Sequence, residues 1–250
     1  MNRKNIFKLI LDIVMAVLFV TFFDKNFISF KFHILSGLVF GALILMHMFL
    51  NKKWIINISK RLFDKSLKTK TRISYILSGA LFVVVFSIII SGIFMMKAAT
   101  YDRVMFWKML HIGASYLSIA LIGVHVGLYW KFVSNMFKKI FEIKNTSRVS
   151  VMLARVTVIA VLIFGMYNIH SQNYFAKVSN TLTYAVQHIV PQDLEAPTDG
   201  GHYEKESLSF VDLTMLYGSI ASVFSIATYY GDVATKKYGK SDKSKMKLAS

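Results

Sequence analysis

Four histidines in two identically spaced pairs are the residues of this sequence most suited to chemistry. His33 and His47 are 14 positions apart, and so are His111 and His125. Each pair encloses an apolar run without charge, which is typical of a membrane-spanning helix. At about 100° per residue, this spacing brings both imidazoles of a pair to within about 40° of one helix face. A rise of about 21 Å then separates them, so they lie near the two edges of a ~30 Å hydrocarbon layer.

Two such helices side by side can hold two haem groups, one at each depth. A neutral imidazole is a strong ligand for haem iron, and one imidazole from each helix fills both axial positions. An iron with both positions filled has no open site for oxygen or substrate, so it only exchanges electrons. The spacing therefore predicts a transmembrane electron carrier whose iron ligands are His33, His47, His111 and His125. The alternative is that the histidines only hydrogen-bond between helices. For a single membrane histidine, we would prefer this explanation.

The composition limits both the class of protein and the type of haem. Hydrophobic residues make up 55% of the 250 residues, and charged residues make up 17%. Six apolar runs predict membrane-spanning helices, at about 6–23, 31–50, 73–96, 105–130, 151–168 and 210–229. The sequence has no Cys, which excludes a covalent c-type haem and thiolate-held iron–sulfur clusters. Any haem is therefore of the non-covalent b type.

The net charge of +17 is distributed as a membrane topology signal. With the N-terminus inside the cell, the outer segments hold only seven of the 30 Lys and Arg residues: Lys25, Lys31, Lys97, Arg103, Lys108, Lys177 and Lys205. All the others fall on the inner side, as the positive-inside rule requires. We therefore expect a multi-pass protein of a bacterial plasma membrane with both termini in the cytoplasm. The basic residues contact anionic lipid headgroups, and no nucleic-acid partner is expected.

The direction of the spans predicts which histidines meet. One span lies between the second and the fourth, so these two helices run the same way, from outside to inside. His33 then pairs with His111 on the outer side, and His47 pairs with His125 on the inner side. The residues around His47 also repeat around His125 at an offset of 78 positions, which suggests two repeated hairpins. Common descent and convergence on one geometry both explain this repeat.

Small and aromatic residues share the faces of the histidines. Gly37 and Phe40 lie on the histidine face of the second span, and Ser115 and Ser118 lie on that of the fourth. Small side chains leave room for a porphyrin plane, and Phe40 falls between the two haem positions. A close helix contact, with the two serines hydrogen-bonding across it, explains the small residues equally well.

The charged residues near the spans indicate a function less clearly than the histidine pairs do. Asp12 lies inside the first span, where a carboxylate suggests a proton or quinone site, or a partner of the inner haem pocket. An interfacial ion pair with Lys8 explains Asp12 as well. Arg103, Lys108 and Arg155 are candidate partners of haem propionates, although anchoring at the membrane interface also accounts for each of them.

The chain divides into three expected parts. Residues 1–135 form a four-helix haem-binding bundle, 136–235 add two spans with an outer segment at 169–209, and 236–250 form a basic, disordered cytoplasmic tail. Within the outer segment, apolar residues recur at intervals of three and four over 173–190 and predict an amphipathic helix. We expect this helix on the outer membrane surface or over the outer haem.

The residues around the histidines also carry a family resemblance, which covers about residues 5–135. Histidine pairs on the second and fourth of four spans resemble the haem-binding bundle of the cytochrome b superfamily. His47 followed by MFLNKKWI, and His125 followed by VGLYW, resemble the flavinylation-associated cytochrome family more closely. The resemblance implies two haem b groups on the four histidines, and electron exchange between membrane quinones and an extracytoplasmic flavoprotein. Where that family often has a further histidine, this chain has Tyr129.

Three functions therefore compete. The first is a dihaem electron-transfer subunit of a membrane oxidoreductase that serves an extracytoplasmic redox partner. The second is a self-contained membrane reductase of quinones or metal ions, with its own site under the 173–190 helix. The third is a membrane protein without haem whose histidines are structural. For the first two, the expected fold class is an all-α membrane protein of six transmembrane helices: a four-helix dihaem cytochrome b-like bundle plus two further helices.

Overall fold

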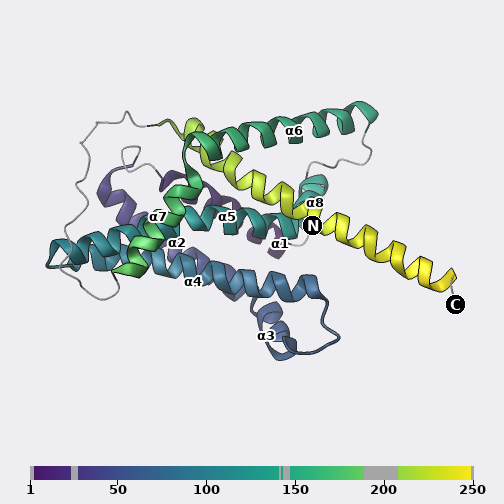
Figure 1. The fold of residues 1–250 in the computed structure, drawn as a ribbon, viewed down its shortest axis with the longest axis horizontal. Helices are drawn as coiled ribbons and strands as arrows, with labels where there is room; N and C mark the ends of the chain where they lie inside the picture. The colour runs from purple at the N-terminus through teal and green to yellow at the C-terminus, as the bar shows by residue number, and fades with distance from the viewer. Residues whose placement is uncertain (1–2, 24–27, 141, 143–146, 189–207, 249–250) are drawn as a thin grey trace.

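The computed structural model describes residues 3–23, 28–140, 142, 147–188 and 208–248, and these residues are almost entirely helical. Eight helices follow one another along the chain (Figure 1): α1 (Arg3–Thr21), α2 (Phe30–Leu50), α3 (Lys52–Arg61), α4 (Thr69–Lys97), α5 (Tyr101–Ile140), α6 (Arg148–Ser171), α7 (Tyr174–Gln187) and α8 (Phe210–Leu248). The all-α fold class is confirmed. Most of the loop predicted after α7 lies outside the described residues.

Five of these helices are long and apolar enough to cross a membrane: α2, α4, α5, α6 and α8 as far as Lys236. They coincide with five of the six predicted spans. Helix α1 covers the remaining one, but it carries four charged residues among its 19 and is not among the five, so its crossing stays a prediction. Large apolar side chains such as Leu35, Val83 and Ile163 are more than 60% exposed, which suits a lipid environment. The fold is that of a multi-pass membrane protein.

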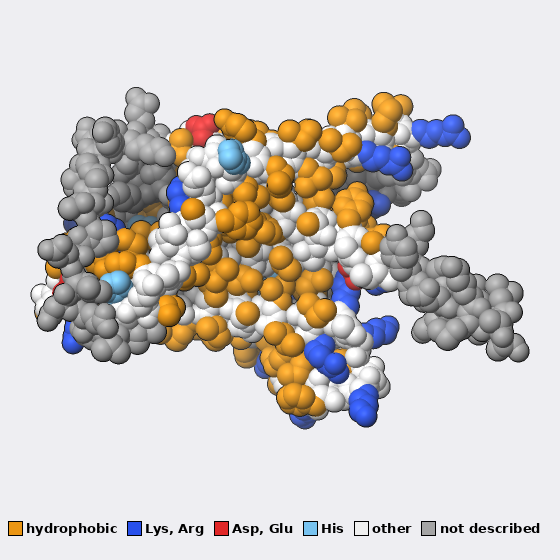
Figure 2. Space-filling view, in the orientation of Figure 1, with side chains coloured by type: hydrophobic (Ala, Val, Ile, Leu, Met, Phe, Trp, Pro, Cys, Tyr) orange, Lys and Arg blue, Asp and Glu red, His pale blue; other side chains and the backbone are white. Residues whose placement is uncertain are grey.

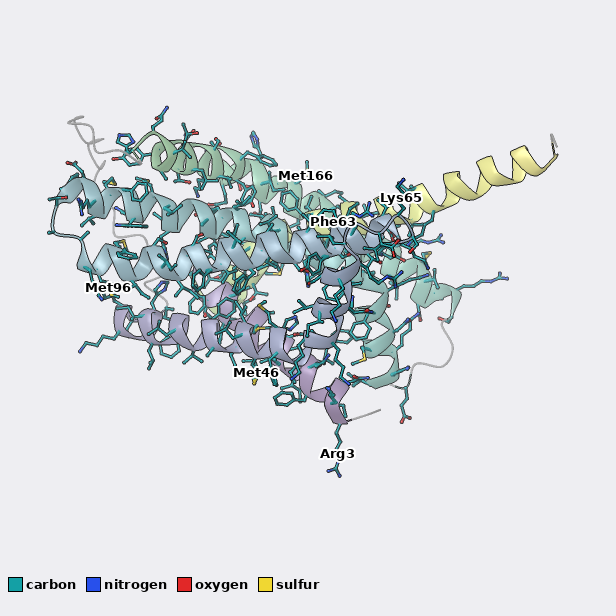
Figure 3. The ribbon with its side chains drawn as sticks, turned by 90° about the horizontal axis from the view of Figure 1, so that it is seen from below. Arg3, Met46, Phe63, Lys65, Met96 and Met166 are labelled. Atoms are coloured by element: carbon teal, nitrogen blue, oxygen red, sulfur yellow. The ribbon has the colours of Figure 1, made fainter. Side chains whose placement is uncertain are left out.

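The two ends of the bundle differ in charge. The start of α1, helix α3, the start of α4 and the last part of α8 gather at one end, here called the basic end (Figure 1). Lys and Arg side chains concentrate there on the visible face (Figure 2). The opposite end carries α7 and is called the α7 end; Figure 3 shows Met96 at this end, and Phe63 and Lys65 at the basic end.

A ring of five helices builds the bundle. Around the ring, α1 packs against α2, α2 against α4, α4 against α5, α5 against α8, and α8 against α1. Within the described residues, α6 packs only against α7 and α8. The helices of the predicted four-helix bundle, α1, α2, α4 and α5, therefore form a complete ring only together with α8, which packs along α5. The boundary expected at residue 135 falls inside α5.

Two glycines of α5 allow the close approach of α8. A Cβ atom on Gly123 or Gly127 would collide with the backbone carbonyl oxygens of Ala221 and Ser225, respectively. Their four-residue spacing places both glycines on one face of α5, as in the small-xxx-small contacts of membrane helices. His125 lies between them in sequence and about 200° away around the helix. The same stretch therefore packs α8 on one face and presents an imidazole on the opposite face.

Helix α7 packs across α5 (Figure 1). The Tyr174 hydroxyl donates to the carbonyl oxygen of Tyr116 at 2.6 Å, and the Tyr174 side chain is almost fully buried. This burial raises the pKa of Tyr174 to about 12. Gly113 of α5 leaves room for Thr181 and Leu182, which a Cβ atom at position 113 would crowd. The amphipathic helix predicted at 173–190 is thus confirmed as a helix, and it is docked on α5.

Two segments differ from the sequence-based expectations. The segment from Lys236 onward, expected to be disordered, continues α8 to Leu248. Its described part has no proline and contains six Lys residues, and Lys is a good helix former. The segment after α2 contains α3, a helix that the sequence analysis did not predict. Its apolar residues Trp54, Ile55 and Ile58 recur at helical spacing, and Ile58 is buried.

Candidate functional site

A cavity of about 1360 Å³ lies between the helices of the ring and α6 and α7. Its walls come from α1, α2, α4 and α5 on one side, and from α6, α7 and α8 on the other. Most of the lining side chains are apolar, and several are aromatic, such as Phe19, Phe22 and Phe40. A pocket for one small molecule usually measures about 300–1000 Å³, so this cavity is unusually large.

His33 and His111, here called the α7-end pair, face each other across this cavity. Their ring centroids are 6.1 Å apart, and their ring planes meet at 57°. The rings come from α2 and α5, whose described Cα atoms nowhere approach within 8 Å of each other. Two metal–imidazole bonds of about 2 Å, with the distance from each nitrogen to its ring centre, span about 6 Å. The spacing therefore suits one metal ion between two helices that do not otherwise touch.

Helix α4 fixes the orientation of His111. The Nδ1 atom of His111 lies 2.8 Å from the carbonyl oxygen of Ile88 and 3.3 Å from the hydroxyl of Ser91. An Nδ1–H that donates to a carbonyl leaves Nε2 unprotonated, which is the form of imidazole that binds metals. Gly92 lies against the ring, because a Cβ atom there would be 3.3 Å from the Cε1 atom of His111. The local sequence of α4 therefore determines the position and orientation of the His111 imidazole.

His47 and His125, here called the basic-end pair, lie near the opposite end of the same two helices. Neither imidazole lines the cavity, and His125 lies close enough to His47 and Asp12 for their charges to act on it. The Nδ1 atom of His47 lies 2.7 Å from Oδ1 of Asp12. Lys8, the alternative partner considered for Asp12, donates instead to Oδ1 of Asn51 at 2.6 Å. The structure thus pairs Asp12 with His47 rather than with Lys8.

One imidazole in each pair has a buried nitrogen without a protein partner. The Nδ1 atoms of His33 and His125 are buried and make no hydrogen bond within the described part of the chain. A buried polar atom left unsatisfied costs about 1–3 kcal/mol. Such nitrogen atoms can form a bond with a bound group that is not part of the protein. Each pair therefore combines one imidazole fixed by a protein acceptor with one that has an unsatisfied nitrogen.

This donor set fits haem better than a bare metal ion. Over the ranges the structure describes, no three His, Cys, Asp or Glu side chains come together in a group that could hold a metal ion. Each pair supplies two ligands, whereas a protein-held transition metal usually needs four or more. A porphyrin provides the four remaining nitrogen donors, and apolar walls suit its faces.

Several other predicted site residues line the cavity. Gly37, Phe40, Ser115 and Lys108 lie in its wall together with the α7-end pair. No heavy atom lies within 4 Å of a Cβ atom built on Gly37, so this glycine borders open space. Phe40 is 8% exposed and stacks on Phe19 with ring centroids 6.4 Å apart. These residues are where a group bound to the α7-end pair would contact the protein.

The remaining predicted site residues lie elsewhere. Ser118 is fully buried and donates to the carbonyl oxygen of Ser115 at 2.6 Å, a bond within α5. Ser115 likewise bonds within α5, so the structure does not support the alternative in which these serines hydrogen-bond across helices. Arg103 is exposed at the start of α5 and does not line the cavity. Arg155 lies on α6, which contacts neither histidine-bearing helix in the described ranges, so it is not placed beside the basic-end pair.

Polar residues on the far side of the cavity were not predicted. Asn168, Gln172, Lys177 and Asp212 line this side, at α6, α7 and α8. Lys177 donates to Oε1 of Gln172 at 3.3 Å and lies 5.3 Å from the centre of the Tyr116 ring. The sequence signal is the amide of Asn168, a polar side chain without charge inside an apolar span.

Comparison with protein families, curated proteins and solved structures finds no match for this chain. Its function is therefore argued from the histidine pairs and the cavity.

Proposed function

We propose that this chain is a membrane cytochrome that carries electrons through two bis-histidine haem b groups. One observation carries the proposal: His33 and His111 face each other with ring centroids 6.1 Å apart, from two helices whose backbones stay apart. In this proposal His33 and His111 hold one haem, and His47 and His125 hold the other. Haem bound in this way supplies one-electron exchange without an open coordination site.

The residues of the chain orient the ligands and exclude water. Ile88 holds the His111 ring through its carbonyl oxygen, and Asp12 holds the His47 ring. The apolar wall around the α7-end pair lowers the local dielectric, which is one means by which a protein adjusts a redox potential. Phe40 lies in sequence between the two ligands of α2 and packs against Phe22 with ring centroids 5.5 Å apart. Electrons would therefore pass between the basic end and the α7 end.

The charge distribution supports an orientation in the membrane. The basic end would face the cytoplasm, in the plasma membrane of a bacterium, because Lys and Arg favour the cytoplasmic side. Helix α7 would then lie outside, near the α7-end pair, as a docking surface for a redox protein. The resemblance to flavinylation-associated cytochromes favours a flavoprotein as that partner and a membrane quinone as the electron source. This last step is an analogy with the family.

Haem content tests the proposal directly. Purified protein should contain two b-type haems per chain in a pyridine haemochrome assay, and acid–acetone should extract both. The reduced and oxidised spectra should both be low-spin, because imidazoles fill both axial positions. A variant with alanine at all four histidines is the control. Protein without haem, or haem that stays on the polypeptide after extraction, contradicts the proposal.

A self-contained reductase is the second candidate, favoured by the size of the cavity. The volume of about 1360 Å³ exceeds that of one typical ligand pocket, and the far side is polar. A quinone or another amphipathic substrate beside Asn168 and Lys177 would give the chain a reaction site of its own. Turnover by the purified chain alone, with quinol and a soluble acceptor, supports this candidate. Haems that are reduced without turnover support the electron-transfer subunit.

A further inference from the structure

The two histidine pairs differ in the group that holds the fixed imidazole. In the α7-end pair, Nδ1 of His111 lies 2.8 Å from a neutral acceptor, the carbonyl oxygen of Ile88. In the basic-end pair, Nδ1 of His47 lies 2.7 Å from the carboxylate oxygen of Asp12. The other histidine of each pair has no acceptor at Nδ1 among the described residues. The two pairs thus differ by one carboxylate.

The charge of Asp12 is directed at His47. Within the described ion pairs, His47 is the partner of Asp12. Lys8 lies four residues earlier on α1, but its ammonium group donates to the side-chain oxygen of Asn51 at 2.6 Å. The Asn51 amide in turn donates to the backbone carbonyl oxygen of His47 at 2.9 Å and lies 3.4 Å from Nε2 of His47. Lys8 is therefore engaged with the end of α2 rather than with the carboxylate.

The type of acceptor changes the electron density of the imidazole. A charged carboxylate draws the Nδ1 proton more strongly than a neutral carbonyl does, because the hydrogen bond is charge-assisted. The opposite nitrogen then becomes a more basic ligand. A more basic axial ligand stabilises the oxidised form of a bound iron, and this lowers its reduction potential. The same haem iron would thus be harder to reduce at the basic-end pair than at the α7-end pair.

We propose that Asp12 is a positioning residue that makes the basic-end haem site the one of lower reduction potential. The inference rests on the proposed function, since it requires a haem at each pair. Asp12 acts through His47 and touches neither iron nor substrate. Electrons that enter at the basic end then move to a site of higher potential at the α7 end. The direction of favourable transfer is therefore from the basic end towards α7.

A redox titration of the purified holoprotein tests this order. Optical spectra recorded during the titration should resolve two components, and His47→Ala should abolish the component of lower potential. If His47→Ala abolishes the higher component, or if the two components titrate together, the inference is overturned. Purified protein without haem overturns the proposed function instead, so the two failures are distinguishable.

Asp12→Asn isolates the effect of the carboxylate, because the amide keeps an acceptor oxygen but lacks the charge. The lower component should shift upward towards the other, which should not move. Asp12→Glu keeps the charge and should stay close to the wild-type protein. Asp232→Asn is the matched control, since Asp232 pairs with Lys70 and Lys236 rather than with a histidine, and it should move neither component.

The outcomes with Asp12→Asn decide the role of the side chain. An unchanged lower component with both haems retained overturns the inference. Loss of the basic-end haem from Asp12→Asn, but not from Asp12→Glu, supports a role of the charge in holding His47. The order of potentials is then decided by the titration of the wild-type protein and His47→Ala.

Discussion

The ring of His111 lies against Gly92, so that a Cβ atom at position 92 would be 3.3 Å from the Cε1 atom of the imidazole. A side chain at this position must push the ring away from its hydrogen bond with Ile88. Gly92→Val should therefore lose the haem at the α7-end pair and about half of the total bound haem, measured per chain by pyridine haemochrome. Gly79→Val is the matched control on the same helix, because no heavy atom lies within 4 Å of its Cβ position. Full haem content in Gly92→Val would mean that His111 is not a ligand in the observed orientation.

The pairing of the histidines makes a second prediction. His33→Ala and His111→Ala should remove the same component of the reduced-minus-oxidised spectrum, because these rings face each other at 6.1 Å. His47→Ala and His125→Ala should remove the other component. Low-temperature difference spectra of the four single variants measure this. If His33→Ala and His125→Ala removed the same component, these two histidines would bind the same haem, and the proposed pairing of His33 with His111 would be wrong.

Hydropathy predicted six membrane-spanning helices, five of which are long and apolar enough in the structure to cross a membrane, and the histidine spacing predicted that His33 faces His111. Both depend on quantities that the bilayer and the helix fix, which are the length of an apolar run and the rise per residue. The closure of the ring by α8 was not predicted. Helices such as α2 and α4 are apolar on all sides, so no amphipathic stripe marks the face that meets a neighbour. The sequence feature that marks the α5–α8 contact is the four-residue spacing of Gly123 and Gly127.

The site was predictable to a similar extent. The face shared by His33, Gly37 and Phe40 follows from helical periodicity alone, and the structure places all three at the cavity. The acceptor of His111 is a backbone carbonyl on α4, and no side-chain pattern encodes such a partner. Arg155 is a candidate propionate partner only by its charge and its depth in a predicted span. Depth does not specify position around the ring, and α6 lies outside it.

The contact between α5 and α8 predicts a loss of stability on enlarging its glycines. A Cβ atom on Gly123 would collide with the carbonyl oxygen of Ala221, so the two helices must separate to accept a side chain. Gly123→Val should destabilise the protein by about 1–3 kcal/mol, the usual cost of overpacking. Thermal unfolding in detergent, followed by circular dichroism, measures the change. Gly231→Ala on α8 is the control, because its Cβ position is open, and an equal loss in both variants would contradict the packing.

The orientation in the membrane can be tested with single cysteines, since the chain has no Cys of its own. Ser179 is exposed on α7, and Ser66 is exposed in the turn between α3 and α4. A membrane-impermeant thiol reagent added to whole cells should label Ser179→Cys and leave Ser66→Cys unlabelled. Permeabilised cells, in which both should react, provide the control. Labelling of Ser66→Cys alone in whole cells would place the basic end outside and reverse the proposed direction of transfer.

The last prediction is that the two histidine pairs act in series. The matched 14-residue spacing on α2 and α5 places the pairs about 21 Å apart along the helix axes, so one pair alone leaves much of a ~30 Å hydrocarbon layer to be crossed. Proteoliposomes with quinol in the membrane should reduce an impermeant acceptor on the α7 side, and His47→Ala should reduce it only at the rate of empty liposomes. Asp232→Asn changes a charge at the basic end without touching a histidine and should match the wild-type rate. Because His47→Ala keeps the α7-end pair, failure of this variant to reduce the acceptor would show that electrons must pass through the basic-end pair first. Reduction at the wild-type rate by His47→Ala would instead mean that quinol delivers electrons directly to the α7-end pair, and the cavity beside that pair would then be the site of delivery.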